Sequence, residues 1–439
     1  MKQAILQIFL ILSVFPATAQ YTVKGGNGVP LLAENDTRNK LEVYLLNGLS
    51  GAEITFTSET EGAHQWYQYT DKAIDAQAIP CNQTGKTSVI TAIAGAQGYF
   101  VGEPTASATR FVWIIDYSNY LPLFYNLSFD DESEDRCKFL KIIMDVEAKP
   151  LPYYTPLGVQ MNLKRTYHLQ YTTRKWDEES KTFVPEAIDK VLTGVLAEEP
   201  VESPLQDTDF TLTGDDFAAH FGLAKKLTTP VYKAIAVEAH ASTEQHKEAG
   251  ENELIVSNTD LGGSVPVNIV FSAEANEPVA AFYIWKIDKI DSATGNRNTI
   301  VRYTDKTLSY NFEDSGDFEV QLEVMDSRSV CVDTTLFYTV NIGETELEVP
   351  NFFSPGTSIG SNDEFRVSYK SILSFQCSIF NRWGNLLYQW NDPAKGWDGR
   401  VGGRFVPTGA YIYVIEYKGT DGVMKTKKGT VNILRSKNQ

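Results

Sequence analysis

The sequence predicts an all-β protein, built of tandem Ig-like β-sandwich domains with a small β-sandwich at the C-terminus. Short apolar segments recur along the 439 residues, separated by turns rich in Gly, Asp and Asn. Within these segments the side chains alternate, so that Tyr411, Tyr413 and Ile415 would fall on one face of a strand. Tryptophans recur at intervals of roughly 110 residues, which suggests degenerate repeats of one fold: Trp66, Trp176 and Trp285.

Residues 1–19 have the pattern of a secretory signal peptide. Lys2 gives the positive start, residues 4–15 form the apolar core, and Ala17-Thr18-Ala19 is a small-x-small cleavage site. We therefore expect the mature chain to begin at Gln20 and to cross the inner membrane. No later stretch approaches the roughly 18 apolar residues of a membrane-spanning helix, so we expect no transmembrane segment.

The net charge of −17 is distributed unevenly along the chain. Residues 351–439 carry 12 Lys and Arg against 6 Asp and Glu, a net charge of +6, and the remainder carries 27 against 50, a net charge of −23. An acidic body argues against nucleic acid as a partner, because phosphates need clusters of Lys and Arg. The basic tail either meets an anionic surface such as lipopolysaccharide or simply marks a domain boundary.

The first expected domain covers residues 20–120 and is an Ig-like β-sandwich. Its strands are expected at residues 41–46, 53–57, 64–69, 98–101 and 111–115. Trp66 lies in the middle of one of these strands, where Ig-like sandwiches place a core tryptophan.

The second expected domain, residues 121–250, is a β-sandwich-like module. Strands are expected at residues 138–146, 167–173, 208–212 and 231–237. Asp215 and Asp216 begin a candidate short helix, because acidic residues suit a helix N-terminus. The polar stretch 241–252 is expected to be a linker or a hairpin loop.

The third expected domain covers residues 251–348, with strands at 265–271, 281–287, 309–312, 316–324 and 334–342. Its Tyr283-x-Trp285 strand and its alternating strand from Gly316 to Val324 resemble the PKD family of Ig-like domains. The Gly-Asp-Gly that usually follows the tryptophan strand in that family is missing here. The β-sandwich prediction is therefore better supported than the family name.

The fourth expected domain covers residues 349–439 and carries six motifs in order. They are Asn-x-Phe-Ser-Pro, Asn-Asp-x-Phe, Arg-Trp-Gly, Trp-Asp-Gly, Pro-x-Gly-x-Tyr and a closing Gly-Thr-hydrophobic strand. The residues that define them are Asn351, Pro355, Asn362, Asp363, Phe365, Arg382, Trp383, Gly384, Trp397, Asp398, Gly399, Pro407, Gly409, Tyr411 and Gly429.

These motifs resemble the gliding-motility-associated C-terminal domain, the type B sorting domain of the type IX secretion system. The resemblance implies that this domain docks on the type IX machinery at the outer membrane. Relatives usually have Asn-Gly-Asp-Gly after the opening proline, whereas this chain has Gly356-Thr357-Ser358-Ile359-Gly360. We expect the motif tryptophans to fill a small core and the glycines to permit turns with positive φ.

Two stretches of the chain resemble catalytic or metal-binding patterns. Residues 356–360 match Gly-x-Ser-x-Gly, but no histidine follows Ser358, so we expect a surface loop. The acidic run 130–135 is either a calcium site or a solvated loop. Four tyrosines either line a glycan or protein groove or pack in cores: Tyr67, Tyr69, Tyr153 and Tyr154. We expect no catalytic residue, no metal ion and no cofactor.

Four cysteines lie far apart, one in each expected domain: Cys81, Cys137, Cys331 and Cys377. Export to an oxidising compartment permits disulfides. A bridge would have to join neighbouring domains, so we expect four thiols, although the sequence does not fix their state.

The sequence thus predicts a secreted or cell-surface protein that passes through the periplasm and leaves by type IX secretion. We expect a non-catalytic adhesion or surface-assembly role, with a surface glycan or protein as a candidate ligand. Two alternatives stay open. One is a carbohydrate-binding protein or hydrolase that uses the N-terminal modules, and the other is a component of the gliding or secretion apparatus.

Overall fold

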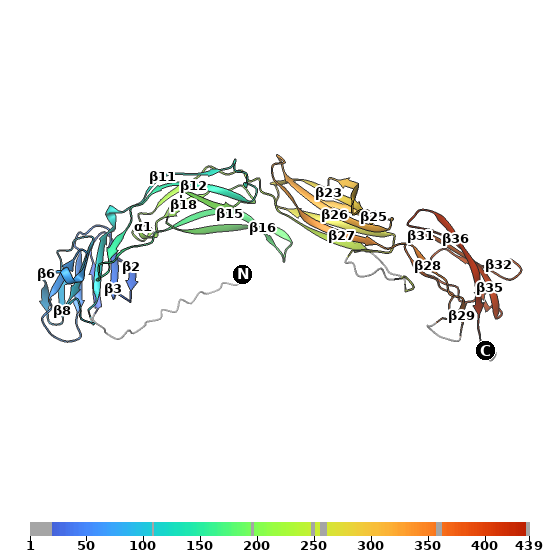
Figure 1. The fold of residues 1–439 in the computed structure, drawn as a ribbon, viewed down its shortest axis with the longest axis horizontal. Helices are drawn as coiled ribbons and strands as arrows, with labels where there is room; N and C mark the ends of the chain where they lie inside the picture. The colour runs from blue at the N-terminus through green and yellow to red at the C-terminus, as the bar shows by residue number, and fades with distance from the viewer. Residues whose placement is uncertain are drawn as a thin grey trace, which may run out of the picture. The chain divides into compact units, whose positions relative to one another are not determined.

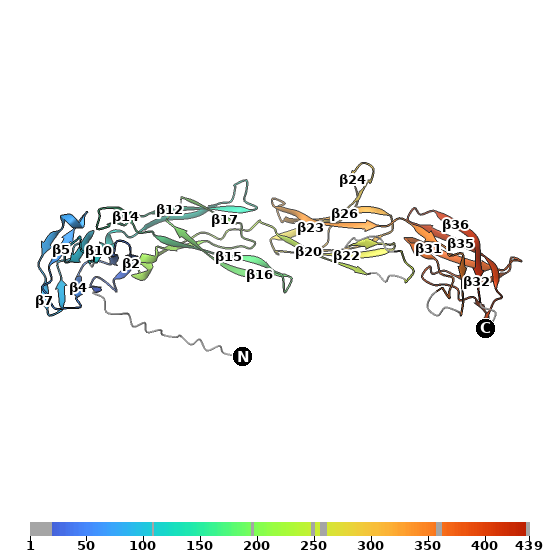
Figure 2. The same cartoon turned by 60° about the horizontal axis from the view of Figure 1, so that its bottom comes forward.

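The computed structural model describes residues 20–107, 109–194, 197–246, 251–254, 261–356 and 362–435 (Figures 1 and 2). The chain divides into two compact units. The first comprises Met1–Thr173, Pro185–Ser203 and Asp207–Lys233, and the second comprises Arg174–Val184, Pro204–Gln206 and Ala234–Gln439. The expected signal peptide, residues 1–19, lies outside the described residues. Across the described residues the elements are β-strands with one short α-helix and two 3-10 helices, Ala73–Asp75 and Tyr117–Asn119, which confirms the all-β prediction.

The first unit begins with two sheets, in the strand orders β1-β4-β8-β7 and β2-β3-β10-β9-β5-β6. Their strands are β1 (Gln20–Lys24), β2 (Leu31–Asp36), β3 (Leu41–Leu46), β4 (Glu53–Thr57), β5 (Trp66–Tyr69), β6 (Gln77–Ile79), β7 (Asn82–Thr84), β8 (Thr87–Ile90), β9 (Gln97–Val101) and β10 (Phe111–Asp116). The strands expected at 41–46 and 53–57 are confirmed. Trp66 is buried, and its Nε1 donates to Ser88 Oγ at 2.8 Å.

Strand β10 is apolar from Phe111 to Ile115 because both of its faces are covered. Phe111, Trp113 and Ile115 join one buried cluster, while Val112 and Ile114 join a second. A strand buried on both faces reads as a continuous apolar run and not as an alternation. β10 pairs with β3 in parallel and with β9 in antiparallel orientation, so it is the centre of the six-stranded sheet.

Residues 121–233 contain nine further strands and α1. These are β11 (Leu123–Asp130), β12 (Phe139–Glu147), β13 (Pro152–Tyr154), β14 (Gln160–Asn162), β15 (Thr166–Asp177), β16 (Thr182–Thr193), β17 (Glu198–Glu202), β18 (Thr211–Gly214), β19 (Lys225–Thr228) and α1 (Asp216–His220). The expected strand at 231–237 is wrong, because within that stretch only Tyr232 forms a bridge, with Thr208. The expected helix is confirmed, and Asp215 is its N-cap.

A buried ion pair anchors α1 inside the first unit. Arg165 Nη1 donates to Asp215 Oδ2, and the hydroxyl of Tyr117 donates to Asp215 Oδ1. Arg165 Nη2 also donates to the carbonyls of Tyr120 and Lys149, at 2.6 and 2.7 Å. Burial, followed by the hydrogen bond to Asp215, raises the pKa of Tyr117, so its hydroxyl stays protonated and donates to the carboxylate.

In the second unit, a sandwich forms from the sheets β20-β22-β25 and β21-β27-β26-β23-β24. The strands are β20 (Ala239–His246), β21 (Gly262–Gly263), β22 (Val267–Ala275), β23 (Ala280–Ile290), β24 (Arg297–Tyr303), β25 (Thr307–Phe312), β26 (Gly316–Asp326) and β27 (Val332–Ile342). Trp285 is fully buried in the core of this sandwich.

Residues 241–252 were expected to be a linker or a hairpin loop, and this is wrong for residues 241–246. They belong to β20, which pairs with β22 from Ala239↔Ala275 to His246↔Asn268. β20 is an edge strand, and past Ala241 its side chains are Ser, Thr, Glu, Gln and His. A strand without large apolar residues gives no alternation signal, so only its pairing partner reveals it.

The last part of the second unit has its own sheet, in the order β29-β36-β35-β31-β32, and its own buried cluster. Its elements are β28 (Glu346–Glu348), β29 (Phe352–Phe353), β30 (Ser368–Lys370), β31 (Ile372–Phe380), β32 (Leu386–Trp390), β33 (Arg400–Val401), β34 (Arg404–Phe405), β35 (Gly409–Gly419) and β36 (Met424–Ile433). The predicted alternation is confirmed, since Tyr411, Tyr413 and Ile415 face this core.

The expectation of four thiols is also corrected. Cys81 and Cys377 are free cysteines. Cys137 and Cys331 are not free thiols. Separately, no helix among the described residues is both long and apolar enough to cross a membrane.

Candidate functional site

The motif residues of the C-terminal domain separate into a buried group and an exposed group. The buried group surrounds Trp397, which is fully buried and donates from Nε1 to the carbonyl of Arg400 at 2.9 Å. The rings of Phe353 and Tyr411 each lie 5.7 Å from the Trp397 ring, centroid to centroid. Phe365 is also fully buried, and its backbone exchanges hydrogen bonds with that of Trp397. These residues form the aromatic core.

The residues next to Trp397 fix the path of the chain around this core. Gly399 has φ of 75°, and a Cβ there would lie 3.0 Å from Pro355 Cγ. Asp398 Oδ1 accepts from the backbone N–H of Arg400 at 3.0 Å. The motif Trp-Asp-Gly therefore closes a tight turn against the opening Pro355, and a side chain at position 399 would push this proline away.

The other motif residues support strand ends and loops. The carbonyl of Asn351 accepts from the backbone N–H of Asn432 at 2.9 Å, and the carbonyl of Pro407 accepts from the Tyr411 hydroxyl at 2.7 Å. Asn362 and Gly409 have positive φ, whereas Asp363 is half-buried. Gly429 leaves room for the Tyr413 hydroxyl, which a Cβ would approach to 2.5 Å.

The exposed group is the turn between β31 and β32, which contains Arg382, Trp383 and Gly384. Trp383 is 71% exposed, so the expectation that both motif tryptophans fill the core is wrong for this one. The Arg382 guanidinium carbon lies 4.3 Å from the centre of the Trp383 ring. Trp383 lies in the turn between two strands, where no second sheet among the described residues packs against it. The alternation of apolar residues ends before this turn, so the sequence could not predict whether Trp383 is buried.

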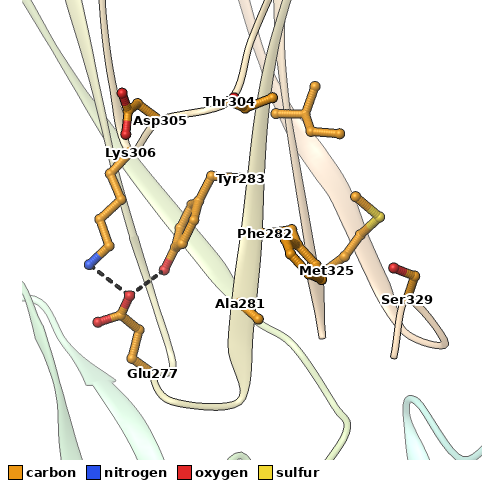
Figure 3. Close-up of a pocket in the computed structure, with 10 residues that line it drawn as sticks. Glu277, Ala281, Phe282, Tyr283, Thr304, Asp305, Lys306, Met325 and Ser329 are labelled. Atoms are coloured by element: carbon orange, nitrogen blue, oxygen red, sulfur yellow. Dashed lines mark hydrogen bonds and ion pairs between the residues drawn. The ribbon is translucent and has the colours of Figure 1, made fainter. Parts of the chain in front are cut away.

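A second candidate site is a pocket of about 540 Å³ on the sandwich that contains β23 (Figure 3). Lys306 Nζ lies 2.8 Å from Glu277 Oε1, and the Tyr283 hydroxyl donates to the same oxygen at 3.3 Å. Phe282 is 49% exposed and lies beside Met325 in Figure 3. The other lining residues are Ala281, Ile284, Thr304, Asp305 and Ser329.

The polar side of this pocket carries charged groups, and two of them, Glu277 and Lys306, pair with each other. Burial raises the pKa of Tyr283, and the nearby Glu277 carboxylate raises it further. The Tyr283 hydroxyl therefore stays a neutral donor at physiological pH. The pocket combines an exposed aromatic ring with a carboxylate and an ammonium group, a combination found in small-ligand binding sites.

Sequence reasoning missed this pocket, although one signal was present. β23 alternates, with Tyr283, Trp285 and Ile287 buried. Phe282 therefore falls on the outward face, where a large aromatic residue is unexpected in a half-buried strand. The remaining lining residues come from separate loops and strands, and only the fold brings them to this place.

The other sequence candidates do not form sites. Tyr69 and Tyr153 are buried, Tyr67 stacks on Phe100 at 5.3 Å, and Tyr154 packs near Trp113, so these tyrosines pack in the core. In the acidic run 130–135, Asp130 accepts from the backbone N–H of Glu132. Across the described ranges, no group of three or more His, Cys, Asp or Glu is placed to hold a metal ion. Ser358 lies outside the described residues.

The five histidines each contact protein groups from their own surroundings and do not converge. Their hydrogen-bond or ion-pair partners include Ser88 Oγ for His64, Asp189 Oδ1 for His168, the carbonyl of Val29 for His220, Glu238 Oε1 for His240 and Glu244 Oε1 for His246.

Comparison with known families identifies two parts of the chain. Residues 347–433 match the CHU_C type IX secretion signal domain, and residues 128–229 match a fibronectin type III domain. The C-terminal domain is thus a type IX secretion signal, and the middle of the chain is an Ig-like sandwich of the fibronectin type III kind. No curated protein sequence matches the chain.

Two solved structures show a distant likeness. Dimeric latent PorU from Porphyromonas gingivalis is 11% identical with a TM-score of 0.17, and the match covers 74% of this chain and 35% of PorU. This chain therefore spans about a third of the length of PorU. A Ca²⁺-stabilized adhesin that helps an Antarctic bacterium bind ice is 10% identical with a TM-score of 0.18, covering 96% of this chain and all of that one.

Proposed function

We propose that this protein is a non-catalytic surface protein that the type IX secretion system exports and whose front domains act in adhesion or surface assembly. The signal peptide delivers the chain to the periplasm, where it folds. The C-terminal domain then docks on the machinery at the outer membrane, and the preceding domains are displayed on the cell surface.

The observation that carries this proposal is the C-terminal domain itself. Residues 347–433 match a secretion signal family, and they form a sheet around a buried cluster of their own. A signal that folds around its own core can be recognised without contribution from the cargo. The acidic front domains would then be cargo, and residues 128–229 among them match a fibronectin type III domain.

Removal of residues 347–439 tests the export step. The truncated chain should keep its signal peptide, enter the periplasm and stay there, because the recognised domain is gone. Cell fractionation and protease treatment of intact cells measure the surface fraction. Normal surface display of the truncated chain would contradict the proposal. The matched control is the full chain in a strain without type IX secretion.

We also propose that the pocket beside β23 is the adhesive contact and that it takes a glycan. Phe282 offers a flat apolar surface for the C–H face of a sugar ring, while Glu277 and Lys306 offer hydrogen bonds to hydroxyl groups. The volume of about 540 Å³ lies within the range of small-ligand sites.

Replacing Phe282 with Ala should weaken glycan binding, because it removes the stacking surface. A glycan array probed with the mature chain measures this, and a loss of at least about tenfold is expected on the best glycan. Phe337→Ala is the matched control, since Phe337 is similarly exposed in the same sandwich but does not line the pocket. Equal binding by both variants would count against the pocket.

The two other candidate functions have distinct readouts. Turnover of polysaccharides by the mature chain would favour a hydrolase over a binding protein. Failure to export other type IX cargo in a deletion strain would favour a component of the apparatus over a passenger.

A further inference from the structure

The outer face of the C-terminal sheet carries an apolar row where solvent is expected. Phe380 of β31 pairs directly with Leu386 of β32 and with Ile412 of β35, so the three side chains share one face. Tyr413 and Ile379 face the core, which places this row on the opposite, outer side. Leu386 is 53% exposed and Ile412 is 40% exposed. An antiparallel sheet usually presents polar side chains to water on its free face.

The apolar character is confined to one end of that face. The next row toward the middle of the sheet still contains Val414, paired with Ser378 and Lys428. The row after it contains Gln376 and Glu416. The row Leu386–Phe380–Ile412 lies immediately before the β31–β32 turn, so the apolar end of the face adjoins the exposed Trp383.

The backbone of that turn is fixed by hydrogen bonds before any partner arrives. Asn381 Oδ1 accepts from the N–H groups of Trp383 and Asn385, at 3.0 and 2.9 Å. The carbonyl of Asn381 accepts from the N–H of Gly384 at 3.0 Å, and Gly384 has φ of 83°. An anchor residue on a fixed turn loses little backbone entropy when it binds.

The charges near the row are basic. Arg382 lies against the Trp383 ring, and Lys428 lies on the outer face beside Val414. Two other lysines of β36 are already engaged, Lys425 with Asp421 and Lys427 with the carbonyl of Leu347. Residues 351–439 as a whole carry a net charge of +6. A partner should therefore present an apolar surface with an acidic rim.

We propose that Trp383, Arg382 and the row Leu386–Phe380–Ile412 form the docking surface, here called the Trp383 surface, for one folded protein of the type IX machinery. This rests on the proposed function, because a secretion signal needs a protein that recognises it. Exposed Trp and Arg beside an apolar strip are the residues that carry most of the energy at protein interfaces. Binding to anionic lipid relies on clusters of roughly four to eight free cations, which this surface does not offer.

The test uses the full chain in its own host, with two variants of this surface. Trp383→Ala removes the anchor, and Arg382→Glu reverses the charge that an acidic rim would contact. Each should lower the surface-exposed fraction by at least about tenfold and leave folded chain in the periplasm. Val423→Ala is the control, because Val423 is also well exposed but lies in the β35–β36 turn, at the other end of the sheet.

The melting temperature of each purified variant shows whether its C-terminal domain is folded. If a folded variant is not exported, the defect lies in docking. If both variants reach the surface normally while removal of residues 347–439 blocks export, the Trp383 surface is overturned and the proposed function stands. If removal of residues 347–439 also has no effect on export, both the Trp383 surface and the proposed function are contradicted. If Trp383→Ala abolishes co-sedimentation with vesicles of lipopolysaccharide and phospholipid, the partner is the lipid surface and the protein partner is overturned.

Discussion

Replacing Asp215 with Asn should destabilise the first unit by about 3 to 5 kcal/mol. Asn keeps the shape of the side chain but removes the negative charge, which leaves the buried Arg165 guanidinium without its counter-charge. The carboxylate also accepts from the Tyr117 hydroxyl and caps α1 through the N–H of Ala218 at 2.9 Å. Calorimetry of the mature chain should show one transition lowered by roughly 6 to 12 °C for a loss near 3 kcal/mol.

Two further variants separate the charge effect from a general loss of packing. Asp216→Asn changes the neighbouring, half-exposed aspartate and should stay within about 0.5 kcal/mol of the wild type. The double variant Asp215→Asn, Arg165→Met should recover part of the loss, because it leaves no unpaired buried charge. If the single Asp215 variant melts like the wild type, the ion pair does not stabilise the unit.

Replacing Trp397 with Ala should cost the C-terminal domain about 3 to 5 kcal/mol. The side chain is fully buried among Phe353, Tyr411 and Tyr388, and the substitution leaves a large cavity together with an unpaired carbonyl at Arg400. A domain of this size unfolds with a free energy of roughly 5 to 13 kcal/mol, so the loss is a large share of its stability. The calorimetric transition of this domain should fall by roughly 12 °C or more.

The second motif tryptophan supplies the comparison. Trp383→Ala removes a ring of the same type that is mostly exposed. The free energy of unfolding of the domain should therefore change by no more than about 0.5 kcal/mol. Both substitutions should impair export, Trp397→Ala through a destabilised domain and Trp383→Ala through a stable domain that lacks its anchor. Equal melting of the two variants would show that Trp397 is not the centre of this core.

The strands that the sequence predicted well are those with one apolar face. β3 and β4 lie where they were expected, and β35 alternates as its sequence indicates. Side-chain alternation is a local property, because each residue reports its own face. The match to a secretion signal family likewise depends on ordered local motifs between residues 347 and 433.

Prediction failed where the outcome depends on a partner distant in the sequence. β20 is polar and becomes a strand only because β22 offers an edge to pair with. Residues 231–237 are apolar enough for a strand, but within this stretch the structure has a β-bridge only at Tyr232, which pairs with Thr208. The sequence placed Asp215 only at the acidic start of a short helix, and its ion pair with Arg165, fifty residues away, was not visible.

The amino-acid sequence by itself determined the all-β class, the alternating strands and the presence of a secretion signal at the C-terminus. The tertiary structure alone decided which motif tryptophan is core and which is surface, and it assembled the pocket around Phe282. The physical reason is that a side chain is buried only when residues from elsewhere in the fold cover it. Trp397 is covered by rings from other strands, whereas Trp383 lies in a turn that no other element among the described residues covers.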